Sequence, residues 1–540
     1  MNKMFLSFLL SMGFAAGCVL AARILLHYFQ LESYQFPGYF RTIRRNLIKS
    51  LLPGCCMMLL TGSVLLFFHL LTSGQTNIWY IRLAETIAVC AGGWIIGRHT
   101  SEKKAKKKMV LTSRMKRLYV FSFIVMSAAL LPAFLLMNDT EHLQKGACAF
   151  VVFFPVLLPI WIALSGLLVW PVEKLISELY FRDAQRILKR RDDLIRIGIT
   201  GSWGKTSVKF ILGTILEEKY HTLVTPASYN TPMGVTKVIR TSLEPGHRVF
   251  VSEMGARHVG DIREMCRLVH PEIGILTSVG PQHLDTFRTL ERIVKTKYEL
   301  IEALPEDGQA FFADDHDICR ELYDKTVVSK HLTGLDPAKN DLWAEEISYS
   351  PEGSSFFLCT RDEKTFCTTE LLGELNIRNI LLCASVALYL GMTMEQISRG
   401  IRKVRPIEHR LQLIHHPGGL NVIDDAFNSN IRGAKQAFQV LCHFPEKRII
   451  VTPGMVELGD KEYAMNREFG ESMAGCCDVA ILVGKKRSEA IREGLTANGF
   501  PEEAVHVVSS LNEATGLLSS IACSGDTVLF ENDLPDNYTE

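Results

Sequence analysis

The fold is decided by the stretch Ile197-Gly-Ile-Thr-Gly-Ser-Trp-Gly-Lys-Thr-Ser207, where a β-branched run leads into a glycine turn and then into a helix-like segment. Gly201 and Gly204 let the backbone approach phosphate oxygens, the helix start supplies free N–H groups, and Lys205 adds a positive charge. The spacing departs from the strict pattern G-x4-G-K-S/T, because Ile199 stands five residues before Gly204. The stretch therefore predicts a loop that binds the phosphates of a nucleotide.

Strand-like and helix-like segments alternate after this loop, which is typical of a parallel sheet with crossover helices. Arg248–Ser252 and Glu272–Ser278 are expected strands, and polar residues follow them at Glu253 and His283. Ligands of such sheets bind beyond the carboxyl ends of the strands. We therefore expect Lys205, Glu253 and His283 to converge on one crevice.

The alternation restarts near Pro406 and predicts a second, Rossmann-like α/β domain. Its expected strands are Leu420–Asp424, Arg448–Thr452, Val479–Val483, Val505–Val508 and Thr527–Glu531.

The first 171 residues differ in character, because long apolar runs are separated by cationic loops. Each run is close to the ~20 residues needed to cross a bilayer. Arg82 and Glu85 lie one turn apart inside the third run, where we expect them to pair; the alternative is a functional role for charges within the membrane. The predicted spans are Met4–Leu25, Leu51–Leu71, Ile78–Ile96, Leu118–Met137 and Ala147–Trp170.

Positive residues gather in two of the loops and predict the orientation of the spans. By the positive-inside rule the N-terminus lies outside, and everything after Trp170 is cytoplasmic at the cell membrane. The run Lys103–Lys108 is interpreted as a topology signal that contacts anionic membrane lipids, and no nucleic-acid partner is expected. The cationic loops contain Arg41, Arg44, Arg45 and Lys49, and then Arg98, Lys103, Lys104, Lys106, Lys107, Lys108, Arg114, Lys116 and Arg117.

The predicted fold class is a multi-domain chain with four parts. An α-helical transmembrane unit of five helices occupies residues 1–171, and an amphipathic connector at the membrane surface occupies 172–193. An α/β P-loop central domain spans 194–405, and the Rossmann-like α/β C-terminal domain spans 406–540. The 14 cysteines include no C-x-x-C pair, so no disulfide framework or cysteine metal site is expected, and a reducing cytoplasm suits the catalytic part.

The chain from about Arg196 onward resembles the Mur ligases, ATP-dependent enzymes that form amide bonds in peptidoglycan synthesis. Within that family it is most similar to the branch that adds D-alanyl-D-alanine. The resemblance rests on seven ordered motifs: Gly198–Ser207, Ser228–Val235, Glu253–Ile262, Thr277–Asp285, Lys295–Leu300, Gly373–Asn379, and Glu408–Arg410 together with Ile423–Asn430.

The resemblance implies a site for ATP and for magnesium, with two Mg²⁺ ions expected. Thr206, Glu253 and His283 would ligate magnesium, and Lys297 would be carbamylated by CO₂ and become a further metal ligand. The alternative for Lys297 is a solvated helix lysine. Lys205, His283, Lys297 and Arg410 would be catalytic. The nucleotide would be bound by Gly201, Ser202, Gly204, Lys205, Thr206 and Ser207 at its phosphates, by Asn376 and Asn379 at adenine, by Arg410 at the γ-phosphate, and by Asp425 at the ribose.

The implied chemistry is activation of a carboxylate. The substrate carboxylate attacks the γ-phosphoryl group, and an amine then attacks the acyl phosphate to give an amide, ADP and phosphate. In the family the last domain swings to close the site, so hinge closure about Arg405–Arg410 is expected.

Several features depart from the family pattern. The membrane unit stands where the family has its domain for the UDP-linked precursor, Leu375 replaces a histidine before Asn376, and Glu531–Tyr538 lacks a K-G-S motif. Trp203 fills a position where the family has a small polar residue, without an evident reason.

The leading hypothesis is an ADP-forming acid–amino-acid ligase at the cytoplasmic membrane face. It would act on a carboxylate-bearing cell-envelope precursor, membrane-borne or presented at the bilayer, and on an amino acid or dipeptide amine, beside other cell-wall synthesis proteins. The alternatives are a poly-γ-glutamate capsule synthase and a non-catalytic, ATP-binding regulator of envelope assembly.

Overall fold

A computed structural model describes residues 3–71, 79–101, 108–137, 141–227, 229–282, 284–314, 317–350, 353–416, 418–426, 431–456 and 458–532. The chain separates into two compact units, Met1–Glu178 and Leu179–Glu540. The boundary between the units falls within one long helix, α8 (Leu158–Lys189).

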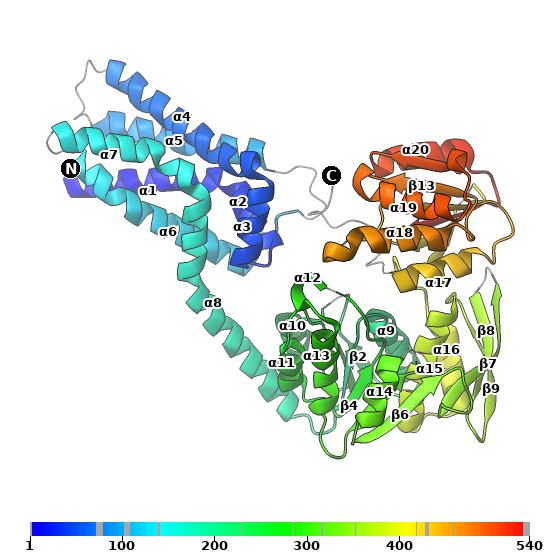
Figure 1. Ribbon diagram of the computed structural model, residues 1–540. Helices are drawn as coiled ribbons and strands as arrows, with labels where there is room; N and C mark the ends of the chain where they lie inside the picture. Colours follow the sequence, from blue (N-terminus) through cyan, green and yellow to red (C-terminus); the bar gives the residue numbers. More distant parts are fainter. Residues whose placement is uncertain are drawn as a thin grey trace. The chain divides into compact units, whose positions relative to one another are not determined.

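All regular secondary structure of the N-terminal unit is helical in the part of the chain described (Figure 1). Five of its segments are long and apolar enough to cross a membrane, which confirms the five predicted apolar helices: Met4–Ala21, Leu47–Leu70, Tyr80–Thr100, Ser113–Leu136 and Leu143–Lys189. The helices are α1 (Lys3–Ala21), α2 (Arg23–Leu31), α3 (Phe36–Arg45), α4 (Leu47–Leu71), α5 (Trp79–Thr100), α6 (Ser113–Leu136), α7 (Glu141–Phe153), the short 3₁₀ turn η1 (Phe154–Leu157) and α8.

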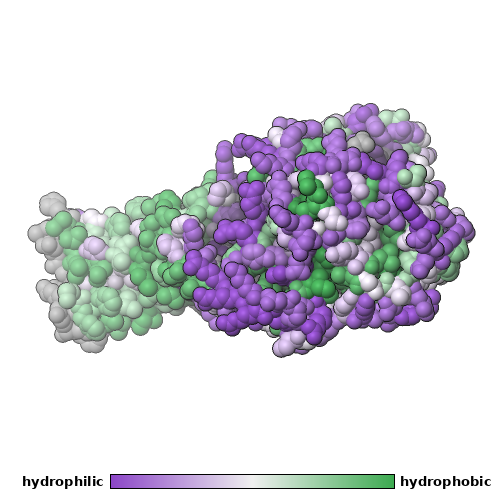
Figure 2. Space-filling view, turned by 90° about the horizontal axis from the view of Figure 1, so that it is seen from below, coloured by the Kyte–Doolittle hydropathy of each residue, from purple (hydrophilic) through white to green (hydrophobic). Residues whose placement is uncertain are grey.

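Small residues bring α1 and α5 into close contact. A Cβ added to Gly93 would lie 2.2 Å from the carbonyl oxygen of Gly17, so only glycine allows this approach. The predicted pairing within α5 is confirmed, because Arg82 Nη1 lies 3.0 Å from Glu85 Oε2. Apolar side chains cover much of the surface of this unit, including Ile48 at 84% exposure and Leu70 at 69% (Figure 2). Such a surface is expected where lipid is the solvent.

The second unit begins with a nine-stranded sheet in the order β2-β3-β1-β4-β5-β6-β7-β8-β9. The strands from β2 to β7 run parallel, and β8 and β9 add an antiparallel arm that the sequence analysis did not predict. The strands are β1 (Ile195–Thr200), β2 (Thr222–Val224), β3 (Val249–Glu253), β4 (Ile273–Leu276), β5 (Gln309–Ala313), β6 (Ser329–Gly334), β7 (Leu342–Ser350), β8 (Gly353–Cys359) and β9 (Lys364–Thr369).

Helices cover both faces of this sheet and form two separate cores. One core contains α9 (Lys205–Leu216), α15 (Glu374–Tyr389) and α16 (Met394–Lys403). The other contains α10 (Pro232–Ser242), α11 (Asp261–Val269), α13 (Leu290–Glu302) and α14 (Asp317–Lys325), with the short helix α12 (Leu284–Phe287) beside them.

The end of α8 belongs to this second core. Phe181, Ala184 and Leu188 are buried with residues of α10 and α11. Asp183 Oδ2 accepts a hydrogen bond of 2.6 Å from Arg240 Nε. The connector predicted at 172–193 is therefore helical as far as Lys189, and its inner end is part of the central domain.

The C-terminal part forms a six-stranded sheet in the order β10-β11-β15-β12-β13-β14, antiparallel only at β10. The five predicted strands are confirmed to within one residue at each end. The elements are β10 (Gln412–His415), β11 (Asn421–Asp425), α17 (Ile431–Leu441), β12 (Arg448–Thr452), η2 (Gly459–Lys461), α18 (Glu462–Met473), β13 (Val479–Val483), α19 (Lys485–Ala497), η3 (Glu502–Ala504), β14 (Val505–Val508), α20 (Leu511–Ile521) and β15 (Thr527–Glu531).

Candidate active site

The phosphate loop joins β1 to α9 and has the geometry expected of an anion cradle. Gly204 is the residue before the helix and has φ +81°, and Gly201 has φ +153°. A Cβ at Gly201 would lie 1.9 Å from Thr277 Oγ1, so no side chain fits there. Ser202 is buried, and Thr206 and Ser207 lie in the first turn of α9. The free N–H groups of that turn point toward the loop, where a phosphate would bind.

Lys205 folds back over its own loop. Its Nζ donates hydrogen bonds to the carbonyl oxygens of Gly201 at 2.8 Å and Ser202 at 3.0 Å. Burial lowers the pKa of Lys205 to about 8; the charge of Glu253 opposes this shift and that of Arg410 adds to it. The Lys205 ammonium therefore lies where the oxygens of a bound polyphosphate would stabilise its positive charge.

Glu253 ends β3 as a buried carboxylate, only 1% exposed, at the centre of a hydrogen-bonded cluster. Its Oε1 accepts from Thr206 Oγ1 at 3.2 Å and from Asn230 Nδ2 at 3.1 Å. Its Oε2 accepts from Lys209 Nζ at 3.0 Å. Burial acts to raise the pKa of Glu253, but the charges of Lys209 and Lys205 and these hydrogen bonds hold it below its usual range.

Lys209 is a partner that the sequence analysis missed. It is fully buried, and it lies four residues after Lys205, on the same face of α9. The sequence did contain a signal for this role. Lys209 follows the phosphate-loop lysine by one turn, on a face of the helix that is otherwise apolar. Asn230 lies within a motif that was recognised, but no role was assigned to it.

Lys297 lies on α13 with 3% exposure, close enough to the same cluster to feel its charges. Burial lowers its pKa well below the usual value; the positive charge of Lys205 acts in the same direction, and Asp261 and Glu253 oppose it. The alternative of a solvated helix lysine is therefore wrong. The structure places Lys205 and Glu253 near each other, as expected from the strand ends, with Thr206 hydrogen-bonded to Glu253 and Lys297 near enough for their charges to act on it.

The fourth expected member, His283, lies outside the described residues. So do Ser228 and the segment 427–430 of two motifs used above. Among the described residues, no group of three or more His, Cys, Asp or Glu side chains could hold a metal ion. The oxygens of Thr206 and Glu253 still fit magnesium, because Mg²⁺ is usually held by one or two carboxylates together with substrate phosphates.

The two asparagines predicted at adenine lie in the first turns of α15. Asn376 Nδ2 donates to the carbonyl oxygen of Leu372 at 2.9 Å. Asn379 is 6% exposed, and a Cβ added at Gly204 would lie 3.0 Å from its Oδ1. Its Nδ2 is buried without a hydrogen bond to any described residue. Asn379 therefore lies beside the phosphate loop with a free donor.

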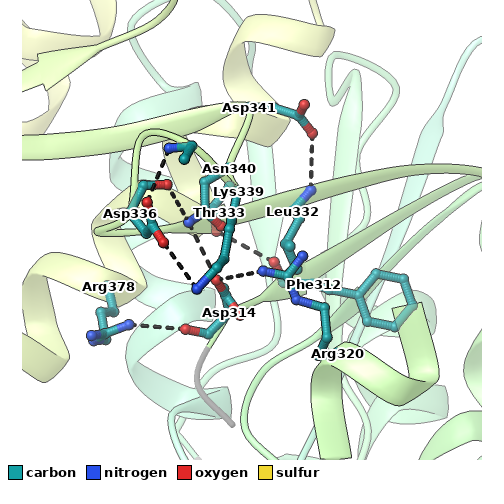
Figure 3. Close-up of polar contacts among 11 residues, drawn as sticks. Phe312, Asp314, Arg320, Leu332, Thr333, Asp336, Lys339, Asn340, Asp341 and Arg378 are labelled. Carbon is teal, nitrogen blue, oxygen red and sulfur yellow. Dashed lines mark hydrogen bonds and ion pairs between the residues drawn. The ribbon is translucent and has the colours of Figure 1, made fainter. Parts of the chain in front are cut away.

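Asp314 links the end of β5 to the start of α15 (Figure 3). Its Oδ2 lies 3.0 Å from Arg320 Nη2 and 3.3 Å from Asn340 Nδ2. Its carbonyl oxygen accepts from Arg378 Nη1 at 2.9 Å. Arg378 lies between Asn376 and Asn379, so this network fixes the helix start that carries both asparagines.

Replacing Arg378 with alanine is expected to raise the KM for ATP about tenfold and to change kcat by less than about twofold, because a charge-assisted hydrogen bond that positions the asparagines is lost. Steady-state ADP release measures both constants. Arg399→Ala is the matched control, since Arg399 forms exposed ion pairs on α16, away from this network. Equal effects of the two substitutions would contradict the role given to Arg378.

Arg410 and Asp425 lie where the two α/β domains join. Asp425 Oδ1 accepts from the backbone N–H of Leu411 at 2.9 Å. Burial raises the pKa of Asp425 to about 6, and the charge of Arg410 opposes this shift. Burial lowers the pKa of Arg410, while Asp425 and Glu253 act to raise it. The Arg410 charge therefore acts on both domains, including Lys205 of the phosphate loop.

The predominantly parallel sheet has a phosphate loop after β1 and a buried carboxylate at the end of β3. Together with a second, Rossmann-like domain, these features define a nucleotide-dependent enzyme of the P-loop class. Two family models match the chain: the Mur ligase middle domain at residues 199–387 and the Mur ligase, glutamate ligase domain at 409–531. The chain belongs to the Mur ligase family. It is thus an ATP-dependent, ADP-forming ligase of peptidoglycan synthesis.

Similar proteins include the UDP-N-acetylmuramoyl-tripeptide–D-alanyl-D-alanine ligases of two bacteria. The Escherichia coli K12 enzyme is 32% identical over 310 residues, covering 57% of this chain and 67% of the relative. The Bacillus subtilis 168 enzyme is 27% identical over 337 residues, covering 62% and 72%. The branch predicted from the motifs is therefore confirmed.

Solved structures show the same fold. MurF from Acinetobacter baumannii superposes with a TM-score of 0.61 at 25% identity, covering 67% of this chain and 78% of that one. MurF ligase from Thermotoga maritima in complex with ADP gives a TM-score of 0.60 at 24% identity, covering 66% and 80%.

Proposed function

We propose that this protein ligates a carboxylate-bearing cell-envelope precursor to an amino acid or dipeptide amine at the cytoplasmic face of the cell membrane. The observation that carries the proposal is the presence, in one chain, of Mur ligase catalytic domains and five apolar helices long enough to span a bilayer. We further propose the domain limits 1–171, 194–405 and 406–540, joined by a connector at 172–193 whose inner end packs on the central domain, with hinge closure about Arg405–Arg410.

ATP would be held by the phosphate loop, with Lys205 exchanging its loop carbonyls for phosphate oxygens. The substrate carboxylate attacks the γ-phosphoryl group, ADP leaves, and the amine displaces phosphate from the acyl phosphate. Lys205 and Arg410 would neutralise the charge that develops on the transferred group. Thr206, Glu253 and His283 would hold two Mg²⁺ ions, which supply further charge neutralisation when bound. Asn376, Asn379 and Asp425 would orient adenine and ribose.

Lys297 is proposed to carry a carbamate. Its lowered pKa favours the neutral amine, whose lone pair can attack CO₂ to form N–COO⁻ with release of one proton. The modified side chain is an anion that suits a site for divalent cations, whereas a protonated Lys297 would be repelled by Lys205. No described carboxylate forms an ion pair with Lys297, although Asp261 and Glu253 are near enough to act on its pKa. Burying an unpaired ammonium is costly, and the modification removes that cost.

A cavity of about 470 Å³ supports an anionic acyl donor. It is lined by His258, Val259, Thr286, Phe287, Arg292 and Lys295. The loop after β3, the end of α12 and the start of α13 contribute its lining residues. Arg292 and Lys295 can present positive charge to carboxylate or phosphate groups, with apolar contacts beside them.

The function is tested by measuring ADP release from the detergent-solubilised protein over pairs of candidate acids and amines, with Lys205→Ala as the inactive control. Turnover with lipid-linked but not soluble UDP-linked muramoyl peptides supports a membrane-borne donor, and equal use of both makes the spans an anchor only. Polymer formation from glutamate alone would favour a poly-γ-glutamate synthase. ATP binding with no turnover above the control for any pair would overturn the ligase proposal.

A further inference from the structure

The phosphate loop is hydrogen-bonded to the connection between β4 and α12. Ser202 N donates to the Ser278 carbonyl oxygen at 2.6 Å. Ser202 Oγ donates to the Gly280 carbonyl oxygen at 2.9 Å and accepts from Gly280 N at 3.0 Å. Thr277 Oγ1 donates to the Trp203 carbonyl oxygen at 2.5 Å. Hydrogen bonds that involve backbone atoms therefore join the phosphate loop to the segment Thr277–Gly280.

The indole of Trp203 covers Gly280 in this arrangement. A Cβ added to Gly280 would lie 2.3 Å from Cη2 and 2.6 Å from Cζ3 of the indole, closer than any real contact. The indole Nε1 is buried and forms no hydrogen bond with a described residue. The benzene edge of the ring thus packs on a residue without a side chain, and the structure gives Trp203 a packing role that a small polar residue could not fill.

We propose that Trp203 is a positioning residue of the nucleotide site. Its ring, packed on Gly280, fixes the phosphate loop against the β4–α12 connection, so that the loop keeps the shape for polyphosphate before the nucleotide arrives. A loop with two glycines has wide conformational freedom. A binding site that is ordered before the ligand arrives loses less conformational entropy on binding. The inference rests on the use of ATP by this loop, and it assigns to Trp203 no contact with substrate.

The contact can be tested with a double-mutant cycle on the full-length protein. ADP affinity in the presence of Mg²⁺ is measured by calorimetry for Trp203→Ser, Gly280→Ala, the two combined, and Trp203→Phe. Gly280→Ala alone is expected to weaken ADP binding about tenfold, because the new Cβ displaces the ring. In the Trp203→Ser background the same change is expected to cost less than about twofold, since the ring is gone. Trp203→Phe, which keeps an aromatic ring, is expected to stay within about threefold of the native affinity.

The melting temperature and the KM for ATP separate positioning from general damage. Trp203→Ser is expected to raise the KM for ATP with little change in kcat and in the KM for the acyl donor. Gly475→Ala is the control for a glycine substitution, since a Cβ there meets nothing within 4 Å. If Gly280→Ala does not fold, recovery of folding in the double variant supports the contact, and failure to recover overturns it.

The inference is overturned if Gly280→Ala weakens ADP binding by the same factor in both backgrounds, or if Trp203→Ser binds ADP as the native protein does. Absence of ADP binding to the native protein would instead overturn the proposed nucleotide site itself. If the native protein binds ADP and turns over, but the effects of Trp203→Ser and Gly280→Ala on ADP affinity simply add, only the role of Trp203 is refuted.

Discussion

Replacing Lys209 with methionine is expected to lower ligase activity by on the order of 100-fold or more and to destabilise the protein by about 3–5 kcal/mol. Lys209 and Glu253 are 0% and 1% exposed, with Nζ 3.0 Å from Oε2. Without Lys209, the buried carboxylate of Glu253 loses its ion-pair partner. It must then take up a proton or turn away from Thr206, and either change removes the oxygen that suits magnesium. ADP release and thermal unfolding measure the two effects.

The double variant Lys209→Met/Glu253→Gln separates stability from activity. It is expected to recover much of the lost stability, because neither buried charge remains, and to stay inactive, because the carboxylate is gone. Native activity in Lys209→Met would show that Glu253 is held by Asn230 and Thr206 alone, contrary to the role given to Lys209.

Lys297→Ala is expected to reduce turnover on the order of 100-fold or more while the protein stays folded, since the substitution removes the anion proposed to form at this position. Activity of the native protein should fall when CO₂ and bicarbonate are removed and return when bicarbonate is added. A carbamate signal after exchange with ¹³C-bicarbonate, absent from Lys297→Ala, is the direct measurement.

Lys295→Ala provides the matched control on the same helix. Lys295 is exposed and lies two residues away, on another face of α13. Because it lines the proposed donor cavity, its loss is expected to raise the KM for the acyl donor, but it should leave both the carbamate signal and the bicarbonate dependence unchanged. A native protein that is equally active without bicarbonate and shows no carbamate signal would refute the modification.

Local sequence predicted the parts of this fold that depend on local patterns. The strands from β11 to β15 are short apolar runs buried in a parallel sheet, and such runs were found to within a residue. The phosphate loop was equally predictable, because glycine spacing and a following lysine set its geometry. The five apolar helices follow from length and composition alone.

The parts that were missed depend on contacts between distant segments. The position of Lys209 one turn after Lys205 was a signal in the sequence, but its partner is clear only when β3 brings Glu253 beside it. Trp203 has no explanation until the segment after β4 places Gly280 under its ring. The antiparallel arm of β8 and β9 pairs within a predominantly parallel sheet, which the alternation of strands and helices did not indicate. The inner end of α8 was expected at the membrane surface, yet Phe181, Ala184 and Leu188 are buried in the central domain.

The Lys205 hydrogen bonds to Gly201 and Ser202 also bear on which anions can occupy the loop. Any incoming anion competes with the loop's own carbonyl oxygens for the same ammonium, and each charged hydrogen bond is worth about 1.5–3 kcal/mol. When a single phosphate ion replaces these carbonyl oxygens, Lys205 only exchanges one set of partners for another, so little binding free energy is gained. A nucleotide would compensate with the further contacts proposed at α15 and at Asp425. The loop is therefore expected to discriminate against inorganic phosphate, which the proposed reaction releases in every turnover.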